Sequence, residues 1–266
     1  MRFGCCMNMI STLPDGTGIE WIETIKKSRY DYVELPLAQM MELDAAGFAA
    51  FRDRVFALGL PCEACNNFFP GTLQLTGLDV DQEKIDRYLA EALDRAEQLG
   101  AKTIVFGSAK AKNVPEGFPR DKAWKQLVDL LRDMDEAVRP RGITIAIEPL
   151  NRQESNIINT VKEGLELAGE VNRKNIGVLV DYYHLVVEEE SSDILLRAAG
   201  HLQHVHFARP EGRVFPSLQD VEEDYALFFS KLRQTGYNGR ISVEAYTSNV
   251  RYDSQETFKL LAGLSA

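Results

Sequence analysis

The sequence lacks any segment that could cross a membrane, and it has few cysteines. No run of 18 apolar residues occurs in its 266 residues, so no transmembrane helix is expected. The apolar stretch at the start is too short for a signal peptide. There are only four cysteines, in a chain long enough to build its own core, so a disulfide framework is not needed. These absences predict a cytoplasmic protein with no membrane association.

An excess of positive charge is also missing. The chain has 30 Lys and Arg against 40 Asp and Glu, a net charge of −10, and only four His. Such a surface repels phosphate backbones, so no nucleic-acid partner is expected. The glycine-rich phosphate motifs of nucleotide-binding proteins are absent as well. With 45% hydrophobic and 26% charged residues, the composition is that of an ordinary globular protein.

The four cysteines are Cys5, Cys6, Cys62 and Cys65, and the last two have the spacing of a redox or zinc pair. However, they lie in a run that predicts a β-strand, where residues three apart point to opposite faces. We therefore expect buried thiols and no redox or metal role for this pair.

What the sequence does contain is a regular alternation of short β-rich runs and longer helical patterns. The predicted strands are 2–8, 32–37, 62–66, 103–107, 143–148, 176–181, 204–208 and 241–245. The predicted helices are 19–28, 45–58, 81–99, 121–139, 161–171, 193–199, 221–235 and 255–264. Almost continuously apolar strands such as Ile143-Thr-Ile-Ala-Ile147 suit a parallel sheet that is buried on both faces. Eight strand–helix units without a linker predict an α/β protein, a single-domain (β/α)₈ TIM barrel over residues 1–266, with an open doubly wound sheet as the alternative.

The last four predicted strands end in side chains that core packing does not explain. These are Glu148, Asp181, His206 and Glu244, each at or near the carboxyl end of its strand. In a barrel those ends meet on one face, where the active site forms. Three carboxylates and an imidazole would repel one another there without a cation. The mixed oxygen and nitrogen set therefore predicts one divalent metal ion.

Two motifs extend this pattern. Glu148 opens Glu-Pro-Leu-Asn-Arg-Gln-Glu154, and Asp181 opens Asp-Tyr-Tyr-His184, while strand four reads Ile104-Val-Phe-Gly-Ser108. With these motifs the sequence resembles the xylose-isomerase-like TIM-barrel sugar isomerase/epimerase superfamily. The resemblance is closest to its ketose 3-epimerases, the D-tagatose and D-allulose 3-epimerase type.

The resemblance implies roles for individual residues. It implies that Glu148, Asp181, His206 and Glu244 hold one divalent ion per subunit, with Mn²⁺ as the expected ion and Co²⁺, Mg²⁺, Fe²⁺ or Zn²⁺ as alternatives. It also implies that Glu154, His184 and Arg213 bind the oxygens of a small sugar substrate near C1 and C2. Relatives of this kind form homodimers and homotetramers, so a homo-oligomer is expected.

The resemblance implies an isomerase that inverts C3 of a ketose, and these residue types suit that chemistry. A divalent ion would polarise the C2 carbonyl and stabilise the enediolate left when the C3 proton departs. Glu148 and Glu244 would be the catalytic acid and base on opposite faces of C3. The alternative is that Glu148 is only a metal ligand and that water returns the proton.

The segment after His206 departs from the epimerase pattern. It reads His206-Phe-Ala-Arg209-Pro-Glu-Gly-Arg213, with Arg209 at a position where relatives carry an acidic residue. Arg213 is the better match to the substrate-binding arginine, and Arg209 is its rival, which could favour a substrate with a phosphate or carboxylate. Further candidates for substrate contact are Phe68, which follows strand three, and Glu34 and Asn8, which lie near the ends of strands two and one.

Three other functions remain open from the sequence. Two use similar chemistry: a dehydratase of an inosose-type polyol ketone, and an aldose–ketose isomerase with a hydroxypyruvate-like substrate. The third, more distant, is an apurinic-site endonuclease, which needs several histidines and a basic DNA-binding surface. Four histidines and a net charge of −10 argue against it.

Overall fold

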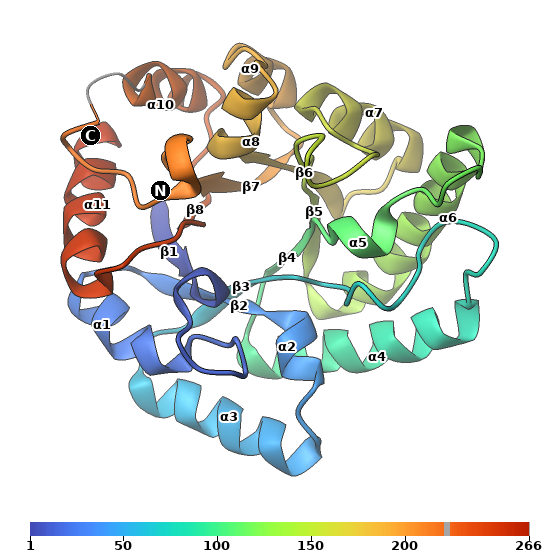
Figure 1. Cartoon of the computed structure of the whole chain (residues 1–266), viewed down its shortest axis with the longest axis horizontal. Coiled ribbons are helices and arrows are strands. Elements are labelled where there is room, and N and C mark those ends of the chain that lie inside the picture. The colour runs from blue at the N-terminus through green and yellow to red at the C-terminus, as the bar shows by residue number, and fades with distance from the viewer. Residues whose placement is uncertain (221–223, 266) are drawn as a thin grey trace.

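Eight parallel strands close into a barrel in the computed structural model, which describes residues 1–220 and 224–265 (Figure 1). Each strand pairs with the next along the chain, and β8 pairs with β1. The strands are β1 (Arg2–Cys6), β2 (Tyr32–Pro36), β3 (Cys62–Asn66), β4 (Thr103–Phe106), β5 (Thr144–Ile147), β6 (Ile176–Asp181), β7 (Leu202–Phe207) and β8 (Arg240–Val243). The predicted (β/α)₈ barrel is confirmed, and the open sheet is excluded.

Helices surround the barrel and cover the outer face of its sheet (Figure 1). They are α1 (Ile22–Lys27), α2 (Leu37–Met41), α3 (Ala45–Leu58), α4 (Gln82–Leu99), α5 (Ala109–Lys112), α6 (Arg120–Val138), α7 (Val161–Val171), α8 (Tyr182–Val187), α9 (Ile194–Ala198), α10 (Tyr225–Gln234) and α11 (Val250–Leu264). The first three residues of the predicted helix 221–235 lie outside the described residues. Within the described part of the chain, no helix is both long and apolar enough to span a bilayer.

Helix α4 shows why the helical pattern could be read from the sequence. Asp81 caps its first turn, accepting a hydrogen bond from the Lys84 backbone N–H at 3.1 Å. Gly100 ends it at φ 90°, a left-handed conformation that favours glycine. Between these ends, one face of the helix is buried against the sheet and carries Ile85, Leu89, Ala92, Leu93 and Ala96.

The barrel interior is partly polar directly below its carboxyl-end face. Tyr32 is fully buried, and its ring lies so close to Gly4 that a Cβ at that position would overlap it. The Tyr32 hydroxyl is 2.8 Å from Ser242 Oγ on β8. Two residues further along each strand come Glu34 and Glu244, because alternate residues of a strand share a face. The inward-facing polar residues therefore lie in two successive levels, and Glu34 and Glu244 belong to the upper one.

All four cysteines are buried free thiols, as expected. The reasoning about Cys62 and Cys65 was nevertheless wrong, because their Sγ atoms are only 4.0 Å apart. The cause is an irregularity in the pairing of β2 with β3. Val33 pairs with Cys62 and Glu34 pairs with Ala64, so Glu63 is an extra residue that breaks the alternation.

Candidate active site

Four side chains from the last four strands converge at the carboxyl-end face of the barrel. Glu148 follows β5, Asp181 ends β6, His206 lies in β7 and Glu244 follows β8. One ligand atom from each lies within 4.8 Å of the others, and all four residues are buried. His206 Nδ1 is 3.1 Å from Glu148 Oε1 and 3.2 Å from Glu244 Oε2. The structure therefore brings together the complete ligand set that the sequence suggested.

Burial and mutual repulsion act on these carboxyl groups. Burial, and then the neighbouring Glu244, raise the pKa of Glu148. Burial likewise raises the pKa of Asp181 to about 7, although Arg213 opposes it. Burial would also raise the pKa of Glu244, but Arg213 and His206 outweigh it and lower that pKa to about 2. The pKa values of these two neighbouring glutamates are thus shifted in opposite directions.

This donor set fits a divalent metal ion. Three buried carboxylates that repel one another, with an imidazole nitrogen among them, offer the hard oxygen and borderline nitrogen ligands that Mn²⁺, Co²⁺ or Mg²⁺ accept. A divalent cation would also relieve the repulsion that raises the pKa of Glu148 and Asp181.

His184 projects an unused donor toward this cluster. Its Nδ1 accepts a hydrogen bond from the backbone N–H of Asn151 at 3.1 Å and lies 3.0 Å from the Asn151 side-chain Nδ2. The proton therefore belongs on Nε2, which lies 3.6 Å from Asp181 Oδ2 and is buried without a hydrogen-bond partner. Asn151 also donates to Glu154 Oε1 at 3.1 Å. The geometry leaves the His184 N–H free to donate to a ligand.

Arg213, not Arg209, reaches the cluster. The Arg213 guanidinium forms an ion pair with Glu244 and lies 3.3 Å from Asp181 Oδ2 and 3.4 Å from Glu154 Oε1. Its φ of 48° is uncommon for a residue other than glycine and is typical of functional sites. Arg209 instead forms ion pairs with Glu211 and Asp220, within its own loop.

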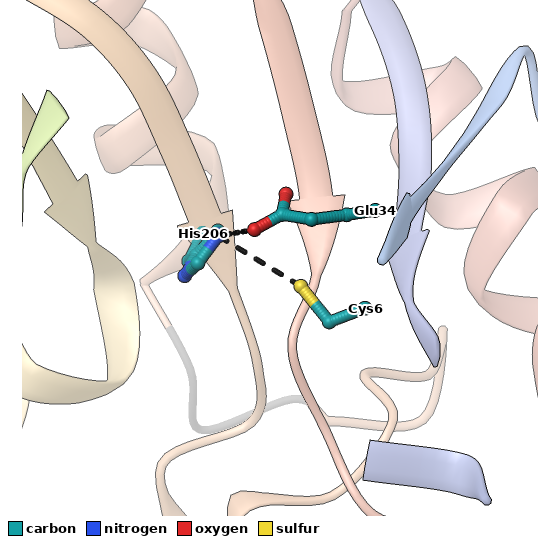
Figure 2. A group of neighbouring side chains, drawn as sticks. All are labelled: Cys6, Glu34 and His206. Carbon is teal, nitrogen blue, oxygen red and sulfur yellow. Dashed lines mark hydrogen bonds and ion pairs between the residues drawn. The ribbon is translucent and has the colours of Figure 1, made fainter. Parts of the chain in front are cut away.

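The three remaining candidates for substrate contact are Phe68, Asn8 and Glu34, and each contacts other side chains of the protein. Phe68 is fully buried and stacks on Phe69 with ring centroids 4.4 Å apart. Asn8 accepts a hydrogen bond from the Asn66 side chain at 3.0 Å. Glu34 is fully buried, and Figure 2 shows its hydrogen bond to His206.

The sequence reasoning missed several site neighbours. Lys112 is fully buried, and its Nζ donates to the main-chain oxygen of Glu148 at 3.0 Å, while burial lowers its pKa to about 8. Nothing in the sequence distinguishes it from a surface lysine of a short helix. The alternation of the strand already places His204 on the face of His206, and Ser242 left the same signal, because it lies two residues before Glu244 and must share its face.

Comparison with known proteins agrees with this architecture. A family model described as xylose isomerase-like TIM barrel matches residues 22–263. The chain belongs to this family. The family predicted from the sequence is therefore confirmed.

Its relatives in the xylose isomerase-like family include sugar epimerases. An L-ribulose 3-epimerase of Methylomonas sp. (strain DH-1) is 31% identical over 228 residues, which cover 84% of this chain and 77% of the relative. A ketose 3-epimerase of Arthrobacter globiformis is 27% identical over 262 residues, 94% of this chain and 85% of the relative. The crystal structure of D-allulose 3-epimerase from Methylomonas sp. with D-allulose matches with a TM-score of 0.85 at 23% identity, over 99% of this chain and 96% of that one.

Proposed function

We propose that this member of the xylose isomerase-like family is a divalent-metal-dependent ketose 3-epimerase. The observation that carries the proposal is the pair Glu148 and Glu244, both buried and both beside His206 Nδ1 in the four-residue cluster. The 3-epimerases among its relatives support the same reaction class. We propose a free ketose as the substrate.

The metal would be held by Glu148, Asp181, His206 and Glu244, with Mn²⁺ as the first choice. When bound, a divalent cation supplies Lewis-acid stabilisation of negative charge on the substrate oxygens at C2 and C3.

The two glutamates are suited to opposite steps of proton transfer. Glu244, with its lowered pKa, is ionised and would accept the C3 proton from one face of the sugar. Glu148, whose pKa is shifted upward, is the better suited of the two to deliver a proton to C3 from the other face. In the reverse reaction the roles exchange. Inversion follows because the proton leaves and returns on different faces.

His184, Glu154 and Arg213 would orient the substrate. The free His184 Nε2–H would donate to a substrate oxygen, while Glu154 would accept from a hydroxyl. We propose Arg213 for the contact near C1 and C2, since it reaches Asp181 and Glu154. Asn8 stays a candidate for a wall of the substrate site, whereas Phe68 and Glu34 are fully buried and Arg209 is paired within its own loop.

Substituting the two arginines separates their roles. Arg213→Ala is expected to lower kcat/KM by about 10- to 100-fold, because a hydrogen bond from a charged donor contributes about 1.5–3 kcal/mol. Arg209→Ala is expected to stay within about twofold of the unchanged enzyme, since its partners are Glu211 and Asp220. Steady-state kinetics of both variants measure this, and a larger loss in Arg209→Ala would reverse the assignment.

The reaction is tested by proton NMR in D₂O. Fructose, tagatose, allulose, ribulose, xylulose and some phosphorylated ketoses are incubated with enzyme and Mn²⁺, with EDTA in the control. The expected result is a metal-dependent C3 epimer that carries deuterium at C3. Deuterium or product at C1 would indicate an aldose–ketose isomerase instead, and turnover only of an inosose would indicate a dehydratase.

Two further properties belong to this proposal. The enzyme would work in the cytoplasm, where its four buried thiols remain reduced. It would assemble as a homodimer or homotetramer, as expected from its resemblance to the epimerases.

A further inference from the structure

A second group of polar side chains adjoins the proposed metal ligands inside the barrel. Its centre is Glu34, which is fully buried on β2. Oε1 of Glu34 is 2.9 Å from His206 Nε2, and Oε2 is 2.7 Å from His204 Nε2. Oε2 also accepts a hydrogen bond from Ser242 Oγ at 2.6 Å. Both oxygens of this carboxylate are therefore engaged within the barrel.

No lysine or arginine among the described residues forms an ion pair with Glu34, although a buried carboxylate needs compensation. The imidazoles of His204 and His206 and the hydroxyl of Ser242 supply that compensation through their hydrogen bonds. These hydrogen bonds restrict the orientation of the His204, His206 and Ser242 side chains, because each hydrogen bond in a fully buried site is costly to leave unmade.

The contact with His206 determines which ring nitrogen can bind a metal. A carboxylate 2.9 Å from Nε2 requires that the proton lie on Nε2. The other nitrogen, Nδ1, faces Glu148 and Glu244. With Nε2 protonated, Nδ1 can present its lone pair to a cation in the cluster.

We infer that Glu34 is a positioning residue for the metal ion: it fixes the orientation and tautomer of His206 so that Nδ1 becomes the ligand. The inference rests on the metal site of the proposed function. Carboxylates that accept a hydrogen bond from a metal-binding histidine orient the ring and increase its basicity, and their loss weakens metal binding by about 10- to 100-fold.

The position of Cys6 suggests an alternative, in which Cys6, Glu34 and His206 bind a second metal ion. Its Sγ lies 3.8 Å from His206 Nε2, and Figure 2 shows Cys6 and Glu34 approaching that nitrogen together. Ligand atoms of Cys6, Glu34 and His206 lie within 4.8 Å of one another, which would suit a second metal ion. Against this, a second ion on Nε2 would displace the proton that the 2.9 Å contact with Glu34 requires. We therefore assign the three side chains to support of a single metal site.

The test measures Mn²⁺ affinity by electron paramagnetic resonance of the free ion, with metal-free protein and no substrate. Glu34→Gln keeps the size of the side chain but removes its negative charge and one of its two acceptor oxygens, so it can no longer accept from both His206 and His204. The expected result for Glu34→Gln is a Kd for Mn²⁺ raised about 10- to 100-fold.

Glu34→Asp provides a second variant, which keeps the charge but is shorter by one methylene. It is also expected to bind Mn²⁺ more weakly than the unchanged chain. Ser242→Ala is the matched control, because it removes a partner of Oε2 and leaves the His206 contact; its Kd should change less than about threefold.

Circular dichroism of each variant establishes that the protein compared is folded. A Kd for folded Glu34→Gln within twofold of the unchanged chain would overturn the inference while leaving the proposed function intact. Two Mn²⁺ ions per chain, with the second lost in Cys6→Ser, would overturn it in favour of a second metal site. Failure of the unchanged chain to bind Mn²⁺ would overturn the proposed metal site, and this inference with it.

Discussion

Glu148→Gln and Glu244→Gln are each expected to lower the kcat for C3 epimerisation by about 10²- to 10⁴-fold, the usual contribution of a general acid or base. Glutamine keeps the size of the side chain and an oxygen that can still face the metal, but it cannot exchange a proton at neutral pH. The measurement is kcat with the ketose identified by NMR, in the presence of saturating Mn²⁺. Glu166→Gln, on the exposed face of α7, is the control and should leave kcat unchanged.

Deuterium exchange makes this prediction specific to two bases. In Glu148→Gln, Glu244 can still remove the C3 proton from one epimer and return deuterium to the same face. That epimer should therefore gain deuterium at C3 without inverting, and Glu244→Gln should show the same behaviour with the other epimer. Inversion that continues in Glu148→Gln would mean that water returns the proton and that Glu148 is a ligand only.

The ligand set could be predicted because two strong regularities coincide. Strand ends in a parallel barrel meet at one face, and four successive strands end in Glu, Asp, His and Glu. Neither regularity depends on the details of side-chain packing. The hydrogen bonds of Glu34 do depend on them, since the register between strands decides which side chains are neighbours. Asp181 lies opposite His206, and Cys6 lies opposite Glu34.

In the loop after β7 and in strand β3, the residue pattern alone does not determine which way the side chains point. The sequence favours Arg213 but leaves Arg209 as a rival, and in the structure an antiparallel bridge between Arg209 and Val214 turns the loop so that Arg213 faces the cluster. In β3, the extra residue Glu63 brings Cys62 and Cys65 to the same side. One extra residue in a strand changes which side chains share a face, and the residue pattern of a single sequence does not reveal such an extra residue.

Removal of bound metal is expected to eliminate activity, with Mn²⁺ or Co²⁺ restoring it. Without a cation, Arg213 is the only lysine or arginine among the described residues that forms an ion pair with any of the three buried carboxylates, and the Lewis acid that would stabilise negative charge on the substrate is missing. Activity after exhaustive dialysis against EDTA, and after addition of each ion, measures the dependence. Full activity in metal-free protein would contradict both the ligand assignment and the mechanism.

Thermal unfolding gives a readout that does not require a substrate. Mn²⁺ at about 100 times its Kd should stabilise the fold by about 2.7 kcal/mol, a rise in Tm of about 5–10 °C for a chain of this size. Asp181→Asn should lose most of that rise, while Arg209→Ala should keep it.

At one fixed Mn²⁺ concentration, the rise in Tm should be larger at pH 8 than at pH 6. Burial raises the pKa of Asp181 to about 7, so the metal-free protein favours a protonated Asp181 at pH 6, and that proton must leave before a cation can bind. A rise that was equal at both pH values would indicate that Asp181 is not a ligand.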